Sequence, residues 1–105
     1  NYNQLSLAIN LMENKLSQSL ENELEEFYKT VGKNVKKKRE EKGLTQLQLS
    51  QKMCLKSPGL ISQGELYLNN QHFNLSHLYK IAAILDCSIQ DFFEGVKVVP
   101  WECEE

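Results

Sequence analysis

A chain of 105 residues with 41% hydrophobic and 25% charged side chains has the size and composition of a single ordinary globular domain. No apolar run approaches the roughly 20 residues needed to span a bilayer, which argues against an integral membrane protein, and no secretory signal is visible. The three cysteines are widely spaced and form no Cys-x-x-Cys motif, so we expect reduced thiols rather than a disulfide framework or a zinc site. These features predict a cytoplasmic protein.

The net charge of −2 conceals an uneven distribution along the chain. Residues 1–28 and 81–105 are acidic, whereas residues 29–80 carry ten basic and three acidic side chains. A basic middle between acidic ends is typical of a protein in which one segment faces phosphate. A solvent-exposed charged face is the alternative, and charge alone does not distinguish the two.

The first third of the chain has a helical pattern of apolar residues. In steps of three and four, these residues fall at positions 5, 9, 12, 16, 20, 24 and 27. Asn22 followed by Glu25 resembles a capping box, which predicts one helix over about residues 4–20 and a second over about 22–42. A single continuous helix is the alternative, because no proline separates the two. Gly43 is expected to end the helix, since glycine readily adopts the left-handed conformation.

A pair of short helices is predicted next. Thr45 would cap a helix over about residues 46–53. Ser57 and Pro58 would begin another over about 58–67, because proline at the first helical position loses no needed hydrogen bond. Two short helices joined by a turn have the geometry of a helix-turn-helix, which places its second helix in the major groove of DNA.

The remainder is predicted to contain a loop, two more helices and a tail. Residues 68–73 form the loop, and Asn74 caps a helix over about residues 75–85. Ser88 with Asp91 matches a capping box that opens a short helix. The tail at 96–101 is expected to form either a short strand or an apolar strap.

The order of these pieces resembles the Cro and phage-repressor type of helix-turn-helix domain, the XRE-like family. The resemblance covers residues 31–93 and rests on the segments 31–35, 39–46, 61–65, 78–82 and 88–93. It implies an all-α, five-helix, lambda-repressor-like domain, which in this chain carries an extra N-terminal helix. It also implies that Arg39 and Glu65 pair beneath the recognition helix, since a guanidinium can hold a carboxylate through two hydrogen bonds.

Three features depart from the family pattern. The turn is one residue longer than usual, and Cys54 stands where the family often has glycine, so a positive φ there would cost about 1 kcal/mol. The recognition helix begins with Pro58 and Gly59, where the family presents long polar side chains. Gly64 lies inside that helix. We interpret the two glycines as loosening a helix that becomes fully ordered on DNA.

The resemblance implies DNA contacts by residues of the two short helices and the segments beside them. Gln46 would hydrogen-bond a phosphate, which sets register rather than specificity. Gln63 is the favoured base reader, because its amide can pair with adenine through two hydrogen bonds. The lysine-rich run at 33–38 is interpreted as a solvent-exposed face that adds general attraction. Further candidates for base or backbone contact are Lys56, Ser57, Ser62, Asn69 and Asn70.

Catalytic or cofactor chemistry is not supported by these residues. His72 and His77 do not share a helical face, and no further side chain completes a metal set. No glycine-rich phosphate loop and no local Ser-His-Asp arrangement is present. We therefore expect no enzyme, no metal and no cofactor.

The sequence divides into an extra helix at residues 1–21, a helix-turn-helix domain at 22–95 and a tail at 96–105. The apolar stripe of the first segment must be buried on its own domain or on a second copy. A homodimer is favoured, because paired half-sites in DNA require two recognition helices. The sequence thus predicts a sequence-specific regulator of transcription that binds double-stranded DNA, most simply a dimeric repressor of prokaryotic or phage type. The alternative is an antitoxin-like or antirepressor-like interaction module that holds a protein partner through residues 1–21 or 96–105.

Overall fold

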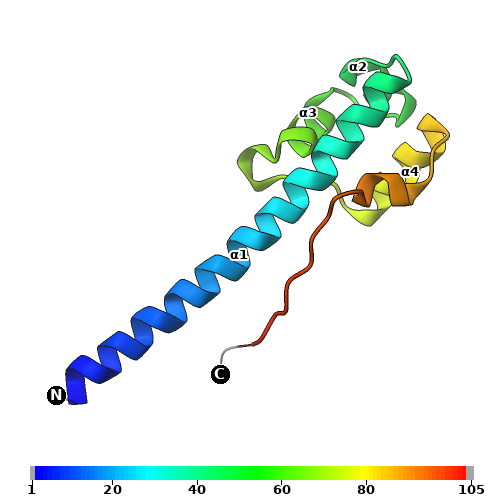
Figure 1. Ribbon diagram of the computed structural model, residues 1–105. Coiled ribbons are helices and arrows are strands. Elements are labelled where there is room, and N and C mark those ends of the chain that lie inside the picture. Colours follow the sequence, from blue (N-terminus) through cyan, green and yellow to red (C-terminus); the bar gives the residue numbers. More distant parts are fainter. Residues whose placement is uncertain (1, 104–105) are drawn as a thin grey trace.

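One long helix runs through the molecule, and the shorter helices gather around its C-terminal half (Figure 1). The computed structural model describes residues 2–103, apart from the side chains of residues 2 and 13–17. No strand occurs in this described range, so the predicted all-α fold is confirmed. In chain order the elements are α1 (Tyr2–Glu41), α2 (Gln46–Lys52), α3 (Gly59–Leu66), the 3-10 helix η1 (Leu68–Asn70), α4 (Leu75–Leu85) and the 3-10 helix η2 (Ile89–Phe93).

α1 is one helix of 40 residues, so the prediction of two helices is wrong and the continuous alternative is correct. Asn22 lies inside α1 and caps nothing; its side-chain oxygen accepts a hydrogen bond from Gln18 Nε2 at 3.3 Å. The surrounding glutamates and leucines are good helix formers, so no residue at this point forces a break. The N-terminal half of α1 extends away from the other helices and gives the molecule a length of 63 Å (Figure 1).

The hydrophobic core forms between the C-terminal half of α1 and the helices packed against it. Among the described side chains, those in the core or packed against it begin at Phe27. Full burial of a large apolar side chain contributes about 1.5–3 kcal/mol to the free energy of folding. The core therefore fixes α2 and α3 in place, while the first half of α1 takes no part in it. The largest fully buried side chains are Val35, Leu49, Ile61, Ile81, Leu85 and Phe92.

Several local signals act as the sequence predicts. Thr45 Oγ1 accepts a hydrogen bond from the backbone of Gln48 at 3.0 Å and so caps α2. Asn74 caps α4 in the same way. Gly43 ends α1 with a φ of +75°, and Cys54 takes the expected positive φ of 61° after α2. These features depend on neighbouring residues, which is why the sequence alone predicts them.

Three boundary predictions are wrong. Ser57 does not cap the recognition helix, because Pro58 occupies the N-cap position and α3 begins at Gly59. Ser88 does not form a capping box; its hydroxyl bonds to the side chain of Gln90 instead. The segment 68–73, predicted as a loop, contains the short helix η1.

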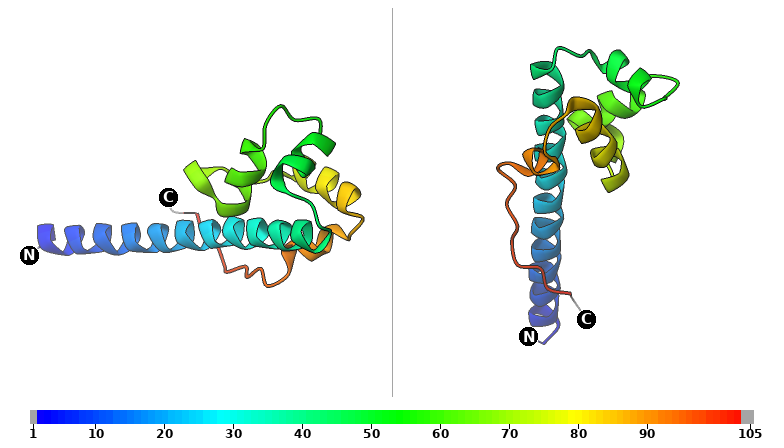
Figure 2. Two further views of the ribbon diagram at one scale, coloured as in Figure 1. Left: turned by 90° about the horizontal axis from the view of Figure 1, so that it is seen from above. Right: turned by 90° about the vertical axis from the view of Figure 1, so that its right-hand side faces the viewer.

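η2 and the first part of the tail lie on the opposite side of α1 from α2 and α3 (Figure 2). Asn34 Nδ2 donates hydrogen bonds to the carbonyl oxygens of Phe92 and Glu94 at 2.9 and 2.8 Å, which ties the end of η2 to α1. Residues 96–101 then run back along α1 without forming a strand. Of the two predicted forms of the tail, a short strand or an apolar strap, the structure therefore shows the strap.

Two glycines allow close packing around α3, one against α1 and one against Phe73. A Cβ atom on Gly32 would lie 2.4 Å from the carbonyl oxygen of Gly64. A Cβ atom on Gly64 would lie 2.7 Å from the ring of Phe73. Protein interiors do not admit such distances, so both positions need glycine. Gly64 is thus required for packing, which corrects the interpretation that it loosens the recognition helix.

We expect Gly32→Ala to lower the free energy of unfolding by roughly 3 kcal/mol, because the new methyl group would meet backbone that cannot move aside. Thermal unfolding followed by circular dichroism measures the effect. Gly59→Ala is the matched control, since its Cβ would approach nothing closer than Ser57 Oγ at 3.6 Å. Equal melting temperatures for the two variants would contradict the close crossing.

The cap of α4 uses a neutral histidine. The backbone N–H of Asn74 donates to His77 Nδ1 at 3.1 Å, and Asn74 Oδ1 accepts from the backbone N–H of His77 at 2.8 Å. Burial, reinforced by the nearby charges of Lys80 and His72, lowers the pKa of His77 from its usual 6.5. A protonated ring could not accept the hydrogen bond from Asn74.

We therefore expect stability to fall on acidification. Because the pKa of His77 is lower in the folded state, the unfolded chain binds more protons, so stability is lost as the pH drops from about 7 through the unfolded value of about 6.5. His77→Gln keeps an acceptor at this position and should remove this part of the loss. Urea unfolding at about pH 7.5 and 5.5 compares the two proteins. The same loss in both would contradict the role of His77.

Candidate nucleic-acid interface

A buried ion pair fixes α3 against α1. Arg39 donates from Nε and Nη2 to the two carboxylate oxygens of Glu65, at 2.7 and 3.0 Å, and from Nη1 to the carbonyl oxygen of Leu44 at 2.7 Å. Both side chains are buried. The hydrogen bond to Glu65 raises the pKa of Arg39, so the guanidinium stays charged. The arginine thus joins α1, the turn after it and α3 through one side chain.

Gln46 is held by the same carboxylate. At the first position of α2, its Nε2 donates to Glu65 Oε1 at 2.9 Å. An amide nitrogen has two N–H bonds, so one remains for a ligand. The sequence assigned Gln46 to a phosphate contact but did not predict this hydrogen bond, which orients the amide before any ligand arrives.

The candidate contact residues in the turn before α3 and on α3 differ in solvent exposure and in the hydrogen bonds that their side chains make. Lys56 and Ser57 are exposed in the turn that precedes α3, whereas Ser62 and Gln63 on the helix are half-buried. Ser62 Oγ donates to the carbonyl oxygen of Gly59 at 3.1 Å, which uses its only hydrogen. Among the described residues, Gln63 makes no side-chain hydrogen bond. Gln63 therefore keeps a full set of donors and acceptors for a ligand.

The surroundings of α3 are open and basic. The N-terminal half of α1 and the tail both run away from α3 (Figures 1 and 2). A groove at the end of α3, beside Leu66, is lined by three lysines and two glutamates: Glu26, Lys29, Lys33, Lys36 and Glu65. Part of the lysine run in α1 thus flanks the helix that the sequence assigns to DNA recognition.

Comparison with known protein families identifies the family to which the chain belongs. A helix-turn-helix family model matches residues 35–92, which is more than half of the chain. The protein belongs to the Cro/C1-type, XRE-like helix-turn-helix family. Members of this family are DNA-binding regulators of transcription. Searches of curated proteins and of solved structures returned no match.

The helix-turn-helix consists of α2 and α3, with α3 as its recognition helix. The turn between them runs from Met53 to Pro58, and Cys54 within it takes a positive φ. Ile61 on α3 is fully buried, so the helix that follows the turn is anchored in the core.

Asn69 and Asn70, which follow the recognition helix, have φ values of 54° and 58°. Asparagine tolerates this left-handed region better than most residues, so both shape the turn after α3. Both are exposed. Their conformational role is sufficient to explain asparagine at these positions, and it is compatible with a contact to the DNA backbone.

A stack of aromatic rings anchors the same turn. The ring of Tyr28 on α1 lies 3.9 Å from His72 at an angle of 11°, and 5.7 Å from Tyr67 at 13°, measured between ring centroids. Sequence analysis missed this contact, because Tyr28 is distant in the chain from both partners and no pattern links them. The stack fixes the segment after the recognition helix to α1.

Within residues 2–103, no three histidine, cysteine or acidic side chains form a group suited to a metal ion. The same range holds no helix with the length and apolar character needed to cross a membrane. Within the same range, none of the three cysteines forms a disulfide.

We expect Arg39→Ala to destabilise the protein by about 3–5 kcal/mol, because Glu65 would be left buried without its partner. Denaturant unfolding measures this change. Lys36→Ala removes the same charge from an exposed position on α1 and should leave stability within about 0.5 kcal/mol of the parent. A small effect of Arg39→Ala would show that the pair does not hold α3.

Proposed function

We propose that this protein is a sequence-specific DNA-binding repressor that occupies its operator as a dimer and catalyses no reaction. The recognition helix α3 supports this proposal, because it is fixed from behind by the Arg39–Glu65 pair, and neither the N-terminal half of α1 nor the described part of the tail lies over it. Reading bases requires side chains held within a fraction of an ångström, which a rigid helix provides.

The proposed DNA contacts are of two kinds: contacts to phosphate, which position the protein on the duplex, and contacts to base edges, which give sequence specificity. Gln46 would donate its second N–H to a phosphate, and Lys56 would add a charged contact nearby. Gln63 would read a base edge, most simply adenine. The remaining candidates have supporting roles, with Ser57 and Ser62 near bases and Asn69 and Asn70 near the backbone.

The lysines of α1 would supply sequence-independent attraction. Among the described residues, Lys33, Lys36 and Lys37 have no ion-pair partner. Lys29 lies 3.8 Å from Glu26, but both side chains are exposed, so this pair is weak. Such uncompensated charge raises affinity for any duplex and makes binding depend on salt.

We expect Gln63→Ala to relax the base preference at one operator position, at a cost of roughly 1–3 kcal/mol for the preferred sequence. Selection of bound duplexes from a random pool, for the parent and the variant, gives both preferences. Gln90→Ala on η2 is the control, because η2 lies on the opposite side of α1 from α3. An unchanged preference at every position would remove Gln63 from the base contacts.

We expect Lys56→Ala to weaken binding to all duplexes alike and to reduce the slope of log affinity against log salt by about 1. Titration of random duplex at several salt concentrations measures the slope. Lys97→Ala in the tail is the matched control and should leave the slope unchanged. If the parent has neither affinity nor a salt slope, the repressor proposal fails.

That last outcome would favour the second candidate function, a protein-interaction module of the antitoxin or antirepressor kind. Its support is the exposed apolar surface at the N-terminal end of α1, which a partner could cover. The open and basic surroundings of α3 favour the DNA-binding function over it.

A further inference from the structure

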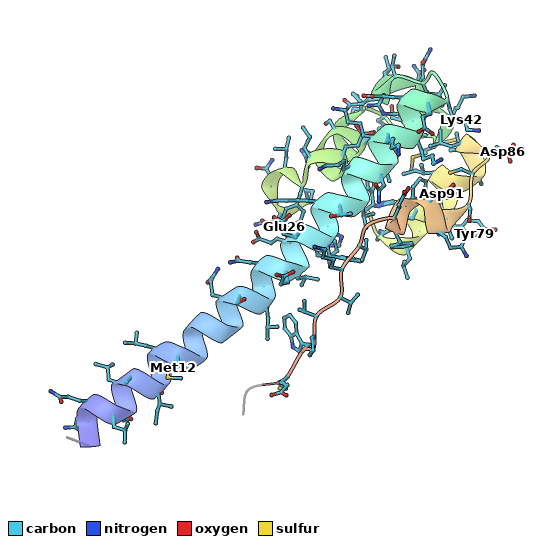
Figure 3. The ribbon with its side chains drawn as sticks, in the orientation of Figure 1. Met12, Glu26, Lys42, Tyr79, Asp86 and Asp91 are labelled. Carbon is cyan, nitrogen blue, oxygen red and sulfur yellow. The ribbon has the colours of Figure 1, made fainter. Side chains whose placement is uncertain are left out.

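The N-terminal part of α1 has an unusual surface for a helix in water. Residues 3–12 are all exposed, and they include Leu5, Ile9 and Met12 at 61%, 46% and 69% exposure. No charged residue precedes Glu13 in the sequence. Figure 3 shows Met12 well away from the other described segments. An uncharged helix with several exposed large apolar side chains is typical of an interface.

Four of the five positions of the apolar stripe on this part of α1 are arranged symmetrically, whereas position 12 would meet the acidic position 13. Positions 5 and 20, and positions 9 and 16, are equally distant from a midpoint between 12 and 13. Two identical helices related by a two-fold axis and running in opposite directions need this arrangement, because position 5 of each then meets position 20 of the other. Farther along, Leu24 and Phe27 continue the stripe towards the tail and the core.

An open apolar pocket of about 140 Å³ lies between α1 and the tail, beside position 20 of the stripe. Val98 and Trp101 form its outer wall and remain 87% and 55% exposed. The symmetry of the stripe brings Leu5 of a second copy to this place. The apolar residues that line the pocket are Leu20, Leu24, Phe27, Val98, Val99 and Trp101.

Charge determines the direction of the pairing. Residues 21–26 contain four glutamates and no basic residue. In a parallel pair these glutamates would lie beside their own copies and repel each other. In an antiparallel pair with this midpoint, Glu21 and Glu23 lie beside positions 4 and 2 of the second copy, which are uncharged. The antiparallel direction therefore avoids the repulsion that the parallel direction creates.

We propose that the N-terminal half of α1 pairs antiparallel with the same segment of a second copy of this chain, and that Leu5 of each copy fills the pocket between α1 and the tail of the other. The inference rests on the dimeric form of the proposed function and specifies its interface. One half of α1 thus builds the helix-turn-helix core, and the other half builds the dimer.

The first test is the mass of the full chain in solution, measured by sedimentation equilibrium without DNA. We expect a dimer for the parent, and a dimer dissociation constant at least about 100-fold higher for Leu5→Glu combined with Ile9→Glu, because both charges would be buried. Leu7→Glu combined with Leu11→Glu is the matched control. These leucines are 62% and 54% exposed on another face of α1, and their replacement should change the constant less than about 3-fold.

A monomeric parent at about 100-fold the concentration used for DNA titration would overturn the pairing. So would a dimer that survives the Leu5 and Ile9 changes, or one that is lost only with the Leu7 and Leu11 changes. Circular dichroism of each variant serves as the check on folding, and we expect it to be unchanged because residues 3–12 make no contribution to the described core.

The second test fixes the direction by disulfide formation, in a background with the native cysteines 54, 87 and 103 replaced by alanine. Leu5→Cys mixed with Leu20→Cys should give a cross-linked dimer on mild oxidation, whereas Leu5→Cys alone should not. Cross-linking of Leu5→Cys alone, or none in the mixture, would overturn the antiparallel arrangement. Because neither test uses DNA, a paired protein that binds no duplex would refute only the repressor proposal, and a DNA-binding monomer only the pairing.

Discussion

The position of the recognition helix depends on one buried interaction, the two-bond contact between Arg39 and Glu65. A carboxylate as deeply buried as that of Glu65 would be strongly destabilising without a partner, so the structure is stable only when the guanidinium reaches it. Arg39 also holds the carbonyl oxygen of Leu44, and Glu65 also accepts from Gln46. One network therefore sets the relation of α1, the start of α2 and α3, and it orients the amide assigned to phosphate.

Close packing at two glycines adds to the Arg39–Glu65 pair in fixing the position of α3. Gly32 allows the backbone of α3 to approach α1, and Gly64 leaves room for the ring of Phe73 behind α3. The turn before α3 brings Pro58 and Gly59 to the start of that helix, where the family resemblance leads us to expect long polar side chains. The recognition helix is thus packed closely against α1, while its first turn carries no long polar side chain.

α1 has different environments along its length. Its C-terminal half packs into the core, its middle lies beside the tail, and its residues 3–12 are exposed. The apolar stripe is continuous through all three parts, which explains why a single uninterrupted helix suits this chain. A rigid helix transmits the orientation of one end to the other, so an interface at the N-terminal end would fix how two helix-turn-helix domains are placed.

The sequence by itself determined the features that depend on neighbouring residues. The caps at Thr45 and Asn74, the helix end at Gly43 and the family-level arrangement of the short helices follow from hydrogen bonds and conformational preferences within a few residues. The family resemblance, supported by the match over residues 35–92, also implied the pairing of Arg39 with Glu65 that the structure shows.

Only the tertiary structure decided whether α1 continues through Asn22, because a capping pattern and a helix interior place the same residue types there. It alone showed that Gly64 is required by Phe73, that Gln46 is bound to Glu65 and that Tyr28 stacks on His72. Each of these depends on contact between residues far apart in the chain, and such contacts leave no periodic or local pattern in one sequence.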